Sequence, residues 1–489
     1  MRHDGRRMFL TAVLVYAAFW NPRLDASMAW NFLDAGVSLV DTGRWMMAHS
    51  ELYERVDTAA AAGGLVTGEP PGMAILAMPV YLAWRAAVGP VVTRQDFAAF
   101  NAACALLLGA TLAALVATQV LAYSQWVGAG RRGRLLAAAL VAFGTANFFL
   151  GTTFFKESVA ALGVLLSVRL AVERRPVLAR AGAGAIAAAA TVVAHPVGLL
   201  VPLLAAMILR REGVRRALAF ALGAAPLVAA LAAYNTWLFG RPWRSGYLAL
   251  TAVEHPGFVW PKLRVLLELL VGTEGGLVLY SPFLLVAVAG LALAWRGGHR
   301  AEAVVAVALL MGSWLAAAAW ISQFSDVASW AHTLGPRMLF PAVPLLAAFT
   351  GPTLDRLGHR ALAALAVPSV SFGYLGAQAG FIPTQTDSTS LAYALKTFVS
   401  GTGMGVFFKE WLPARLGLDT VHTVLTRPEV TARDLPALLA TATGLRLMVN
   451  QAVFLALDVA ALTLVAVIVT AVWKGRLPLA ADERLPCAS

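Results

Sequence analysis

The chain has 489 residues, of which 59% are hydrophobic and only 13% are charged. A chain of this length cannot hide so much apolar surface inside one or two water-soluble cores, so the composition predicts an integral membrane protein. Its formal charge of +12 comes from short arginine clusters between apolar runs, which indicates cytoplasmic loops rather than nucleic-acid binding. The two cysteines, Cys104 and Cys487, lie too far apart in the sequence to suggest a disulfide framework or a paired-cysteine metal site.

Apolar runs of about 17 to 25 residues recur along the chain, which is the length that a helix needs to cross about 30 Å of hydrocarbon. Runs such as 135–143 lack the alternation of a membrane strand, so the predicted fold is all-α and polytopic. We expect 8–20 to be a retained first helix with a cytoplasmic N-terminus, with a cleaved signal peptide as the alternative. The further candidate spans, for a total of about 11–13 transmembrane helices, are 72–90, 97–123, 134–150, 157–172, 179–194, 196–210, 215–238, 281–296, 302–321, 337–352, 360–382 and 450–473.

Polar stretches divide this series of spans. Residues 21–71 form a predicted external loop after the first span, which carries juxtamembrane helices. Residues 384–449 form a predicted extramembrane segment or cap. The expected organisation is a transmembrane catalytic module over 1–383, then that segment, then a last helix and tail over 450–489. The 239–280 stretch is also too polar for a lipid-exposed span.

Strict alternation from a cytoplasmic N-terminus would place the arginine cluster at 131–134 outside, against the positive-inside rule. Two alternatives remain open. Either the 72–90 segment does not cross fully, or that loop is an exception to the rule.

Asp25 is the leading candidate for a catalytic base. It follows the first span directly, between Leu24 and the aromatic residues Trp30 and Phe32. A carboxylate at the membrane interface lies in a region of low dielectric and interacts strongly with a sugar hydroxyl or a metal. The structural alternative, which the sequence supports equally, is a cap on an amphipathic helix over 26–33.

The turn Glu69-Pro70-Pro71-Gly72 closes the first loop. Its prolines force the residue before them into an extended conformation, so Glu69 is held rigidly at the start of the next helix. A rigid acid at a membrane surface suits substrate binding. A simple boundary between loop and helix is equally compatible with the pattern.

The order of these features resembles the GT-C superfamily of lipid-phosphate-sugar glycosyltransferases, and most of all its branch of protein O-mannosyltransferases and aminoarabinose-lipid A transferases. Members carry a catalytic aspartate or Asp-Glu pair in the first external loop, and a turn with Lys or His before proline at its end. Here Asp25 takes the aspartate position, Ala26 replaces the second acid, and Glu69 replaces the Lys or His. Other elements in matching order are 144–147 (GTAN), 154–157 (FFKE), 279–282 (LYSP) and 330–337 (WAHTLGPR).

Two cations at the ends of apolar spans would grip a phosphate as a sugar leaves it. These are Lys156, with Glu157 beside it, and Arg337, with His332 nearby in sequence. Such charges are costly at span ends unless they are paired or functional. The structural alternatives for Lys156 are snorkelling towards the membrane surface and an ion pair with Glu157. Arg244 would contact acceptor or lipid headgroup, with interfacial anchoring as its alternative.

His195, inside an apolar stretch and followed by Pro196, is predicted to be a packed residue at a kink rather than a metal ligand. Motifs of P-loop ATPases, zinc proteases and serine hydrolases are missing from the sequence. Energy for any transfer would then come from an activated lipid-linked donor.

The resemblance therefore implies a cell-envelope enzyme of the cytoplasmic membrane, with its active site outside. The high usage of Ala, Gly and Arg indicates a bacterial source. It would move a sugar from a polyprenyl-phosphate donor, with inversion, to a glycan, lipid or protein acceptor. Asp25 would be catalytic, and a divalent metal is the one cofactor left open. A transporter or lipid flippase and a non-catalytic membrane scaffold are the alternatives. The expected substrate-binding residues are Glu69, Lys156, Glu157, Arg244, His332 and Arg337.

Overall fold

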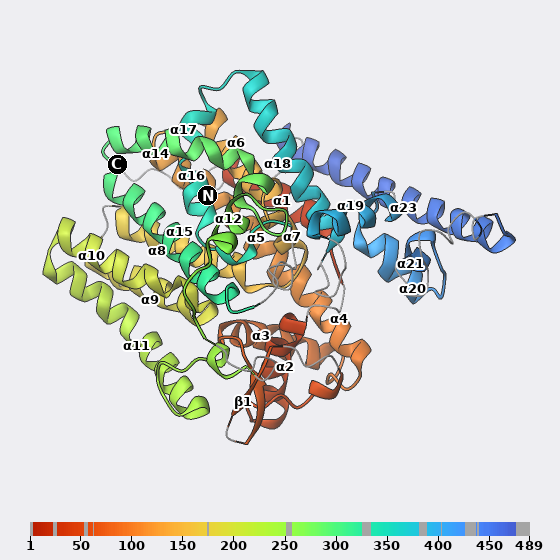
Figure 1. Cartoon of the computed structure of the whole chain (residues 1–489), viewed down its shortest axis with the longest axis horizontal. Coiled ribbons are helices and arrows are strands. Elements are labelled where there is room, and N and C mark those ends of the chain that lie inside the picture. Colours follow the sequence, from red (N-terminus) through yellow and green to blue (C-terminus); the bar gives the residue numbers. More distant parts are fainter. Residues whose placement is uncertain are drawn as a thin grey trace.

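The computed structural model describes residues 3–22, 27–52, 57–61, 63–173, 176–250, 257–324, 334–380, 389–401, 403–425, 437 and 440–475. Within these ranges the chain is almost entirely helical (Figure 1), which confirms the predicted all-α polytopic fold. Among the described residues, five helices are long and apolar enough to cross a membrane: Arg94–Trp126, Val214–Phe239, Arg300–Ile321, His359–Ala379 and Ala442–Trp473. The total of 11–13 crossings stays a prediction.

The first half of the chain builds the centre of the bundle around α5. Helix α5 packs against α1, α6 and α8, while α9 packs between α8 and α11. The elements of this half are α1 (His3–Ala18), α2 (Ser27–Thr42), η1 (Ser50–Leu52), β1 (Thr58–Ala61), β2 (Gly64–Thr67), α3 (Gly72–Ala87), α4 (Arg94–Cys104), the π-helical η2 (Ala105–Gly109), α5 (Ala110–Trp126), α6 (Arg131–Phe143), α7 (Asn147–Thr152), α8 (Lys156–Val172), α9 (Val177–Val193), η3 (His195–Leu199), α10 (Leu200–Glu212), α11 (Val214–Phe239) and η4 (Gly246–Ala249).

The second half packs several short helices onto this centre and ends in one long helix. The predicted 337–352 span, which contains Pro344, is broken into η7, α16 and α17 instead of one helix. In contrast, α3, α11 and α18 each continue through an internal proline. The elements are α12 (Leu263–Val271), α13 (Leu277–Tyr280), η5 (Pro282–Val286), α14 (Ala287–Arg296), α15 (Arg300–Ile321), η7 (Arg337–Leu339), α16 (Val343–Ala348), α17 (Gly351–Leu354), α18 (His359–Ala379), α19 (Ser390–Gly401), the π-helical η8 (Phe407–Trp411), α20 (Leu412–Arg415), α21 (Val421–Leu425) and α23 (Ala442–Trp473).

The first loop forms a compact lobe at one end of the bundle, where Figure 1 shows α2, α3 and β1 together. Helix α2 packs on α3 so closely that a Cβ on Gly36 would lie 2.8 Å from the carbonyl oxygen of Ala74. Strands β1 and β2 form an antiparallel hairpin in which Thr58 faces Thr67 and Ala61 faces Gly64. The lobe therefore contains helices of its own, as expected for this loop.

An ion pair shows how the chain enters and leaves this lobe. Asp4 on α1 pairs with Arg131 and Arg134 at the start of α6, at 3.0 Å each. Both ends of the intervening chain thus lie at the same end of the bundle. If α1 leads away from that end and α5 returns to it, α3 adds no crossing. The ion pair is thus compatible with the first alternative for the 72–90 segment, which stays a prediction.

The other arginine clusters lie at the same end. Arg180, near the start of α9, pairs with Glu212 at the end of α10 at 2.7 Å, and Arg211 pairs with Glu302 on α15 at 2.8 Å. Arg132 donates to the carbonyl of Leu357, ahead of α18, at 3.0 Å. We call this the arginine-rich end. The positive-inside rule predicts that it faces the cytoplasm.

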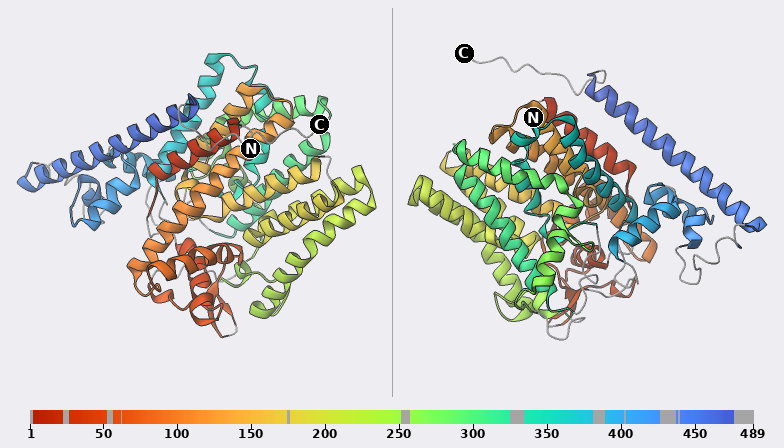
Figure 2. Two further views of the ribbon diagram at one scale, coloured as in Figure 1. Left: turned by 180° about the vertical axis from the view of Figure 1, so that it is seen from behind. Right: turned by 45° about the horizontal axis from the view of Figure 1, so that its top comes forward.

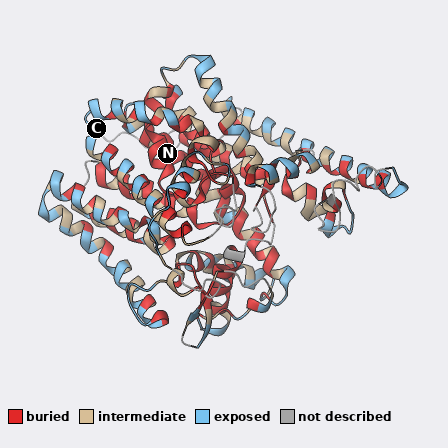
Figure 3. Ribbon diagram, in the orientation of Figure 1, coloured by how far each residue is buried: buried red, intermediate tan, exposed pale blue. Residues whose placement is uncertain are grey.

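Helix α23 stands apart from the rest. It projects away from the bundle in both views of Figure 2, and exposed residues cover most of its length in Figure 3. It begins at Ala442, eight residues before the predicted 450–473 span, so the end of the predicted 384–449 segment is helical. Its Asp458 is buried and accepts a hydrogen bond from the Gly405 N–H at 3.2 Å. This carboxylate therefore faces protein, as a charge within a span must.

Helices α9 and α11 cross at small residues. A Cβ on Gly184 would lie 2.0 Å from the carbonyl oxygen of Phe220, and one on Gly223 would lie 1.9 Å from that of Ala181. Such contacts allow backbones to approach closely, and they leave no room for a larger side chain.

We therefore predict that Gly223→Leu lowers the thermal unfolding midpoint of the purified protein in detergent. Overpacking costs about 1 to 3 kcal/mol, and the contact here is to rigid backbone. Ala221→Leu is the matched control, because Ala221 lies on the exposed face of the same helix. Equal midpoints for the two variants would contradict the close crossing.

Candidate functional site

A buried ion pair joins the first loop to α8. The Lys156 ammonium donates to one carboxylate oxygen of Glu69 and to the hydroxyl of Tyr247 on η4. The Tyr247 hydroxyl in turn donates to that same Glu69 oxygen at 2.7 Å. Lys156 is 7% exposed and Glu69 is 2% exposed. Three segments that are distant in sequence therefore meet through one cation, one anion and one phenol.

The sequence explains how each side chain is positioned. Phe155, the residue before α8, has extended backbone, and Lys156 is the first helical residue after it. Glu69 precedes the two prolines that lead into α3. A Cβ on Gly246 would lie 2.4 Å from the carbonyl oxygen of Gly68, so η4 approaches the Glu69 turn at backbone distance. Only glycine fits there, which brings Tyr247 within reach.

A second buried pair lies beside the first. The Nε atom of Arg337, at the start of η7, is 3.6 Å from one carboxylate oxygen of Glu157, and both side chains are 4% exposed. The Arg337 guanidinium lies 5.4 Å from the centre of the Phe155 ring. Lys156 thus pairs with Glu69, while its sequence neighbour Glu157 pairs with Arg337. The predicted Lys156–Glu157 alternative is wrong as the main pairing of that lysine.

Several buried polar atoms of this group lack a hydrogen-bond partner among the described residues. They are the second carboxylate oxygens of Glu69 and Glu157 and both ring nitrogens of His195. The His195 ring packs edge-on to Tyr247, with ring centres 6.1 Å apart. Buried polar groups are nearly always satisfied by protein, water or a ligand. These oxygens and nitrogens therefore remain able to accept or donate further hydrogen bonds.

Asp57, at the base of the β-hairpin, belongs to the same electrostatic group. It has φ of 58°, and its carbonyl accepts a hydrogen bond from the Gly68 N–H at 2.8 Å. Burial raises the pKa of the Asp57 carboxyl to about 6, and the charge of Glu69 acts in the same direction. The charges of Lys156 and Arg337 oppose this rise. The carboxyl is thus poised to hold or release a proton near neutral pH.

The structure brings together four of the seven predicted site residues: Glu69, Lys156, Glu157 and Arg337. Arg244 is exposed, two residues before η4, and stands outside this buried group. Asp25 and His332 lie outside the described residues. Among the residues that are described, no three His, Cys, Asp or Glu side chains gather where they could hold a metal.

Sequence reasoning did not select Asp57 or Tyr247. It predicted His195 as a packed residue at a kink, and His195 begins η3 just after α9, with its ring packed against that of Tyr247. One signal could have found Asp57. The Gly63-Gly64 pair predicts a hairpin turn, and a hairpin brings residue 57 beside residue 68. Tyr247 gave no such signal, because only tertiary contacts place η4.

Two of the other motifs explain the framework around the site. The Ser281 hydroxyl of the 279–282 element donates to the carbonyl of Gly144, in the 144–147 element, at 3.0 Å. Asn147 donates to the Tyr16 hydroxyl on α1 at 2.9 Å and accepts from Ser158 on α8 at 3.1 Å. These motifs therefore tie the first helix to the helix that carries Lys156.

No family model and no curated protein matches the chain. Among solved structures, the chain is similar to the crystal structure of ArnT from Cupriavidus metallidurans in the apo state. Sequence identity is 13%, the TM-score is 0.46, and the likeness covers 95% of this chain and 73% of that chain. ArnT is an aminoarabinose-lipid A transferase of the GT-C superfamily. A likeness of this size carries no residue roles across, so the roles proposed below rest on this chain's own contacts.

We predict that Lys156→Met strongly destabilises the protein, because it leaves the Glu69 carboxylate buried without its cation. Breaking a buried ion pair on one side costs about 3 to 5 kcal/mol. The double variant Lys156→Met/Glu69→Gln should recover part of this loss, since no unpaired charge remains. Thermal unfolding in detergent measures both. The exposed Arg244→Met is the control, and a loss as large in that variant would contradict a specific role for the pair.

The raised pKa of Asp57 predicts a pH-dependent stability. The folded state binds this proton more tightly than the unfolded chain, whose carboxyl has an ordinary pKa of 3.8. The resulting stabilisation is complete below about pH 4 and is lost as the pH rises through about 6. Asp57→Asn keeps the protonated shape and suits a positive φ. It should unfold at a higher temperature than the native protein at pH 8, with the difference vanishing at pH 4; a constant difference would count against the shift.

Proposed function

We propose that the chain is a membrane glycosyltransferase that moves a sugar from a polyprenyl-phosphate carrier to an acceptor hydroxyl. The observation that carries the proposal is the pair of buried cations, Lys156 and Arg337, each held by a carboxylate with one unpaired oxygen. Buried charges at the end of a span are costly, so they mark a function. The resemblance of the motif order to the GT-C superfamily supports the same assignment.

The two cations would receive the leaving phosphate. As the bond between the anomeric carbon and the phosphate oxygen breaks, negative charge grows on the phosphate. Fixed cations in a buried, low-dielectric site stabilise that charge more in the transition state than in the ground state. The unpaired oxygens of Glu69 and Glu157 would accept hydrogen bonds from sugar hydroxyls and so orient the donor.

Asp25 would act as the base that takes the proton of the acceptor hydroxyl. The acceptor oxygen then attacks the anomeric carbon from the face opposite the phosphate, which inverts the configuration at that carbon. One carbon–oxygen bond forms while another breaks, and the proton passes to Asp25. The leaving polyprenyl phosphate retains the electron pair of the broken bond.

The site would face the outside of the cytoplasmic membrane of a bacterial cell. Lys156 begins α8, whereas the arginine-rich end lies around the last residues of that helix, where Arg180 donates to the carbonyl of Glu173 at 2.9 Å. If the arginine-rich end is cytoplasmic, the two cations lie at the outer leaflet. Acceptors there include envelope glycans, lipids and exported proteins.

We predict that Asp25→Asn abolishes sugar transfer while leaving folding and membrane insertion intact. Arg337→Met should lower the turnover number by about a hundredfold or more, because one lost oxyanion contact is worth 2.7 to 4 kcal/mol, roughly. Purified full-length protein is incubated with a panel of radiolabelled undecaprenyl-phosphate sugars, and donor consumption is measured. Arg215→Met, at an exposed position of the arginine-rich end, serves as the control with native turnover.

Other outcomes would point to other classes. Movement of intact donor across a proteoliposome membrane, without consumption, would identify a flippase. Unchanged turnover in Asp25→Asn would remove that aspartate from the mechanism. A native protein that neither consumes nor moves any donor in the panel would contradict the proposed function.

A further inference from the structure

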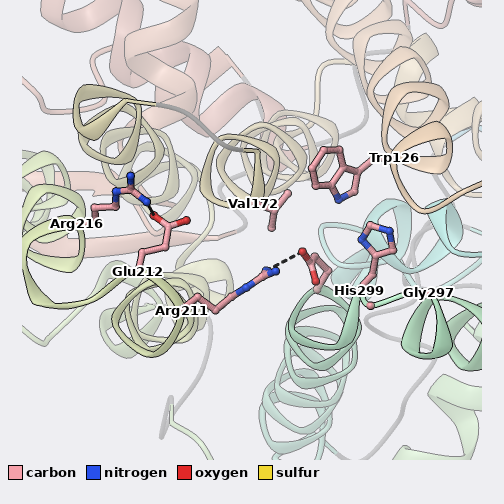
Figure 4. A pocket seen from close by; sticks show the side chains of 9 residues that line it. Trp126, Val172, Arg211, Glu212, Arg216, Gly297 and His299 are labelled. Carbon is pink, nitrogen blue, oxygen red and sulfur yellow. Dashed lines mark hydrogen bonds and ion pairs between the residues drawn. The ribbon is translucent and has the colours of Figure 1, made fainter.

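A polar hollow of about 570 Å³ opens at the arginine-rich end of the bundle (Figure 4). It lies at the opposite end of α8 from Lys156, and a 17-residue helix is roughly 25 Å long. The hollow is therefore separate from the proposed glycosyl-transfer site. Its lining comes from α5, α8, α10, α11, the α14–α15 turn and the first turn of α15, and includes Trp126, Arg211, Glu212, Arg216, His299 and Glu302.

Two arginines offer this hollow an anion-binding surface. Arg211 donates through one nitrogen to Glu302 at 2.8 Å, and Arg216 lies 3.3 Å from Glu212. Their side chains are 41% and 43% exposed, so both remain accessible. A guanidinium has five N–H donors, and one contact leaves the others to bind phosphate.

Glu302 gives the hollow an acceptor as well. It is 1% exposed, and its second carboxylate oxygen is buried without a partner among the described residues. Figure 4 shows the Arg211 side chain at the hollow, with the Trp126 and His299 rings also bordering it. The Trp126 and His299 ring centres are 5.8 Å apart. An indole face and an unpaired carboxylate oxygen both favour a cation that carries N–H groups.

We propose that this hollow binds the phosphoethanolamine headgroup of a membrane lipid. Arg211 and Arg216 would bind the phosphate, and the unpaired oxygen of Glu302 would accept from the primary ammonium. The lining carries both arginines and glutamates, so it offers partners for both charges of a zwitterion.

A lipid fits the hollow better than the free soluble compound. Large apolar side chains next to its lining residues in sequence are exposed, namely Leu209 at 49%, Val214 at 63% and Trp295 at 47%. Exposed side chains of this kind at the end of a membrane bundle, with tryptophan and arginine among them, mark the headgroup region of a bilayer.

The test is a native mass spectrometry titration of delipidated full-length protein in detergent with phosphatidylethanolamine, phosphatidylcholine and phosphatidylglycerol. Phosphatidylethanolamine should bind about tenfold more tightly than phosphatidylcholine, whose ammonium has no N–H to donate. Arg211→Ala should weaken phosphatidylethanolamine binding about tenfold. Glu302→Gln should reduce it to the level of phosphatidylcholine. Arg215→Ala, an exposed neighbour outside the lining, should bind as the native protein does.

Two results would overturn the proposal. Equal binding of all three lipids, unaffected by the Arg211 and Glu302 variants, would show nonspecific lipid adhesion. Equally tight binding of O-phosphoethanolamine would assign the hollow to a soluble compound instead of a lipid.

Arg216→Ala provides a second test of the phosphate contact should Arg211→Ala fail to fold, as judged by its thermal unfolding. Because the glycosyl-transfer assay does not involve this hollow, either proposal can fail alone.

Discussion

A buried ammonium needs an anion beside it, and the ion pair that Lys156 forms with Glu69 determines how one end of the molecule is arranged. Its partner Glu69 comes from the first loop, and Tyr247 comes from a segment after α11. Removing two charges from water costs several kcal/mol per ion, which only close contact and further hydrogen bonds repay. The ion pair thereby holds the lobe of α2, β1, β2 and α3 against the bundle, at the place where the motifs converge. Glu157, the next residue of α8, forms a second buried ion pair with Arg337.

Hydropathy predicts the long helices well because their apolar runs are continuous. The 97–123 and 215–238 runs lie within Arg94–Trp126 and Val214–Phe239. Helix ends are predicted less well where tertiary contacts determine where a helix breaks. Helices α6 and α7 break near Gly144, since α18 passes so close that a Cβ on Gly373 would lie 2.1 Å from the Phe143 carbonyl oxygen. No local pattern reports such a contact.

The site shows the same division. Glu69, Lys156, Glu157 and Arg337 could be selected from the sequence because a charge at the end of an apolar run needs a reason. Their pairing could not. Adjacent residues on a helix point about 100° apart, so Lys156 and Glu157 face different neighbours, and the nearest charge in sequence is the wrong partner. Tyr247 and Asp57 join them only through folding of η4 and of the hairpin.

Helix α23 has 32 residues and is roughly 48 Å long. This length is well beyond the thickness of a hydrocarbon core, which is about 30 Å. Only 11% of its most apolar window is buried by protein. Its polar contacts lie near its last turn, where Trp473 donates to Thr11 at 2.8 Å, at mid-length, where Asp458 meets Gly405, and nearer its start, where Asn450 donates to the Asp419 carbonyl at 2.7 Å. Lipid must surround the rest of α23, so the thickness of the bilayer contributes to the tilt angle of this helix. Thicker and thinner membranes should therefore tip this helix differently while leaving the bundle unchanged.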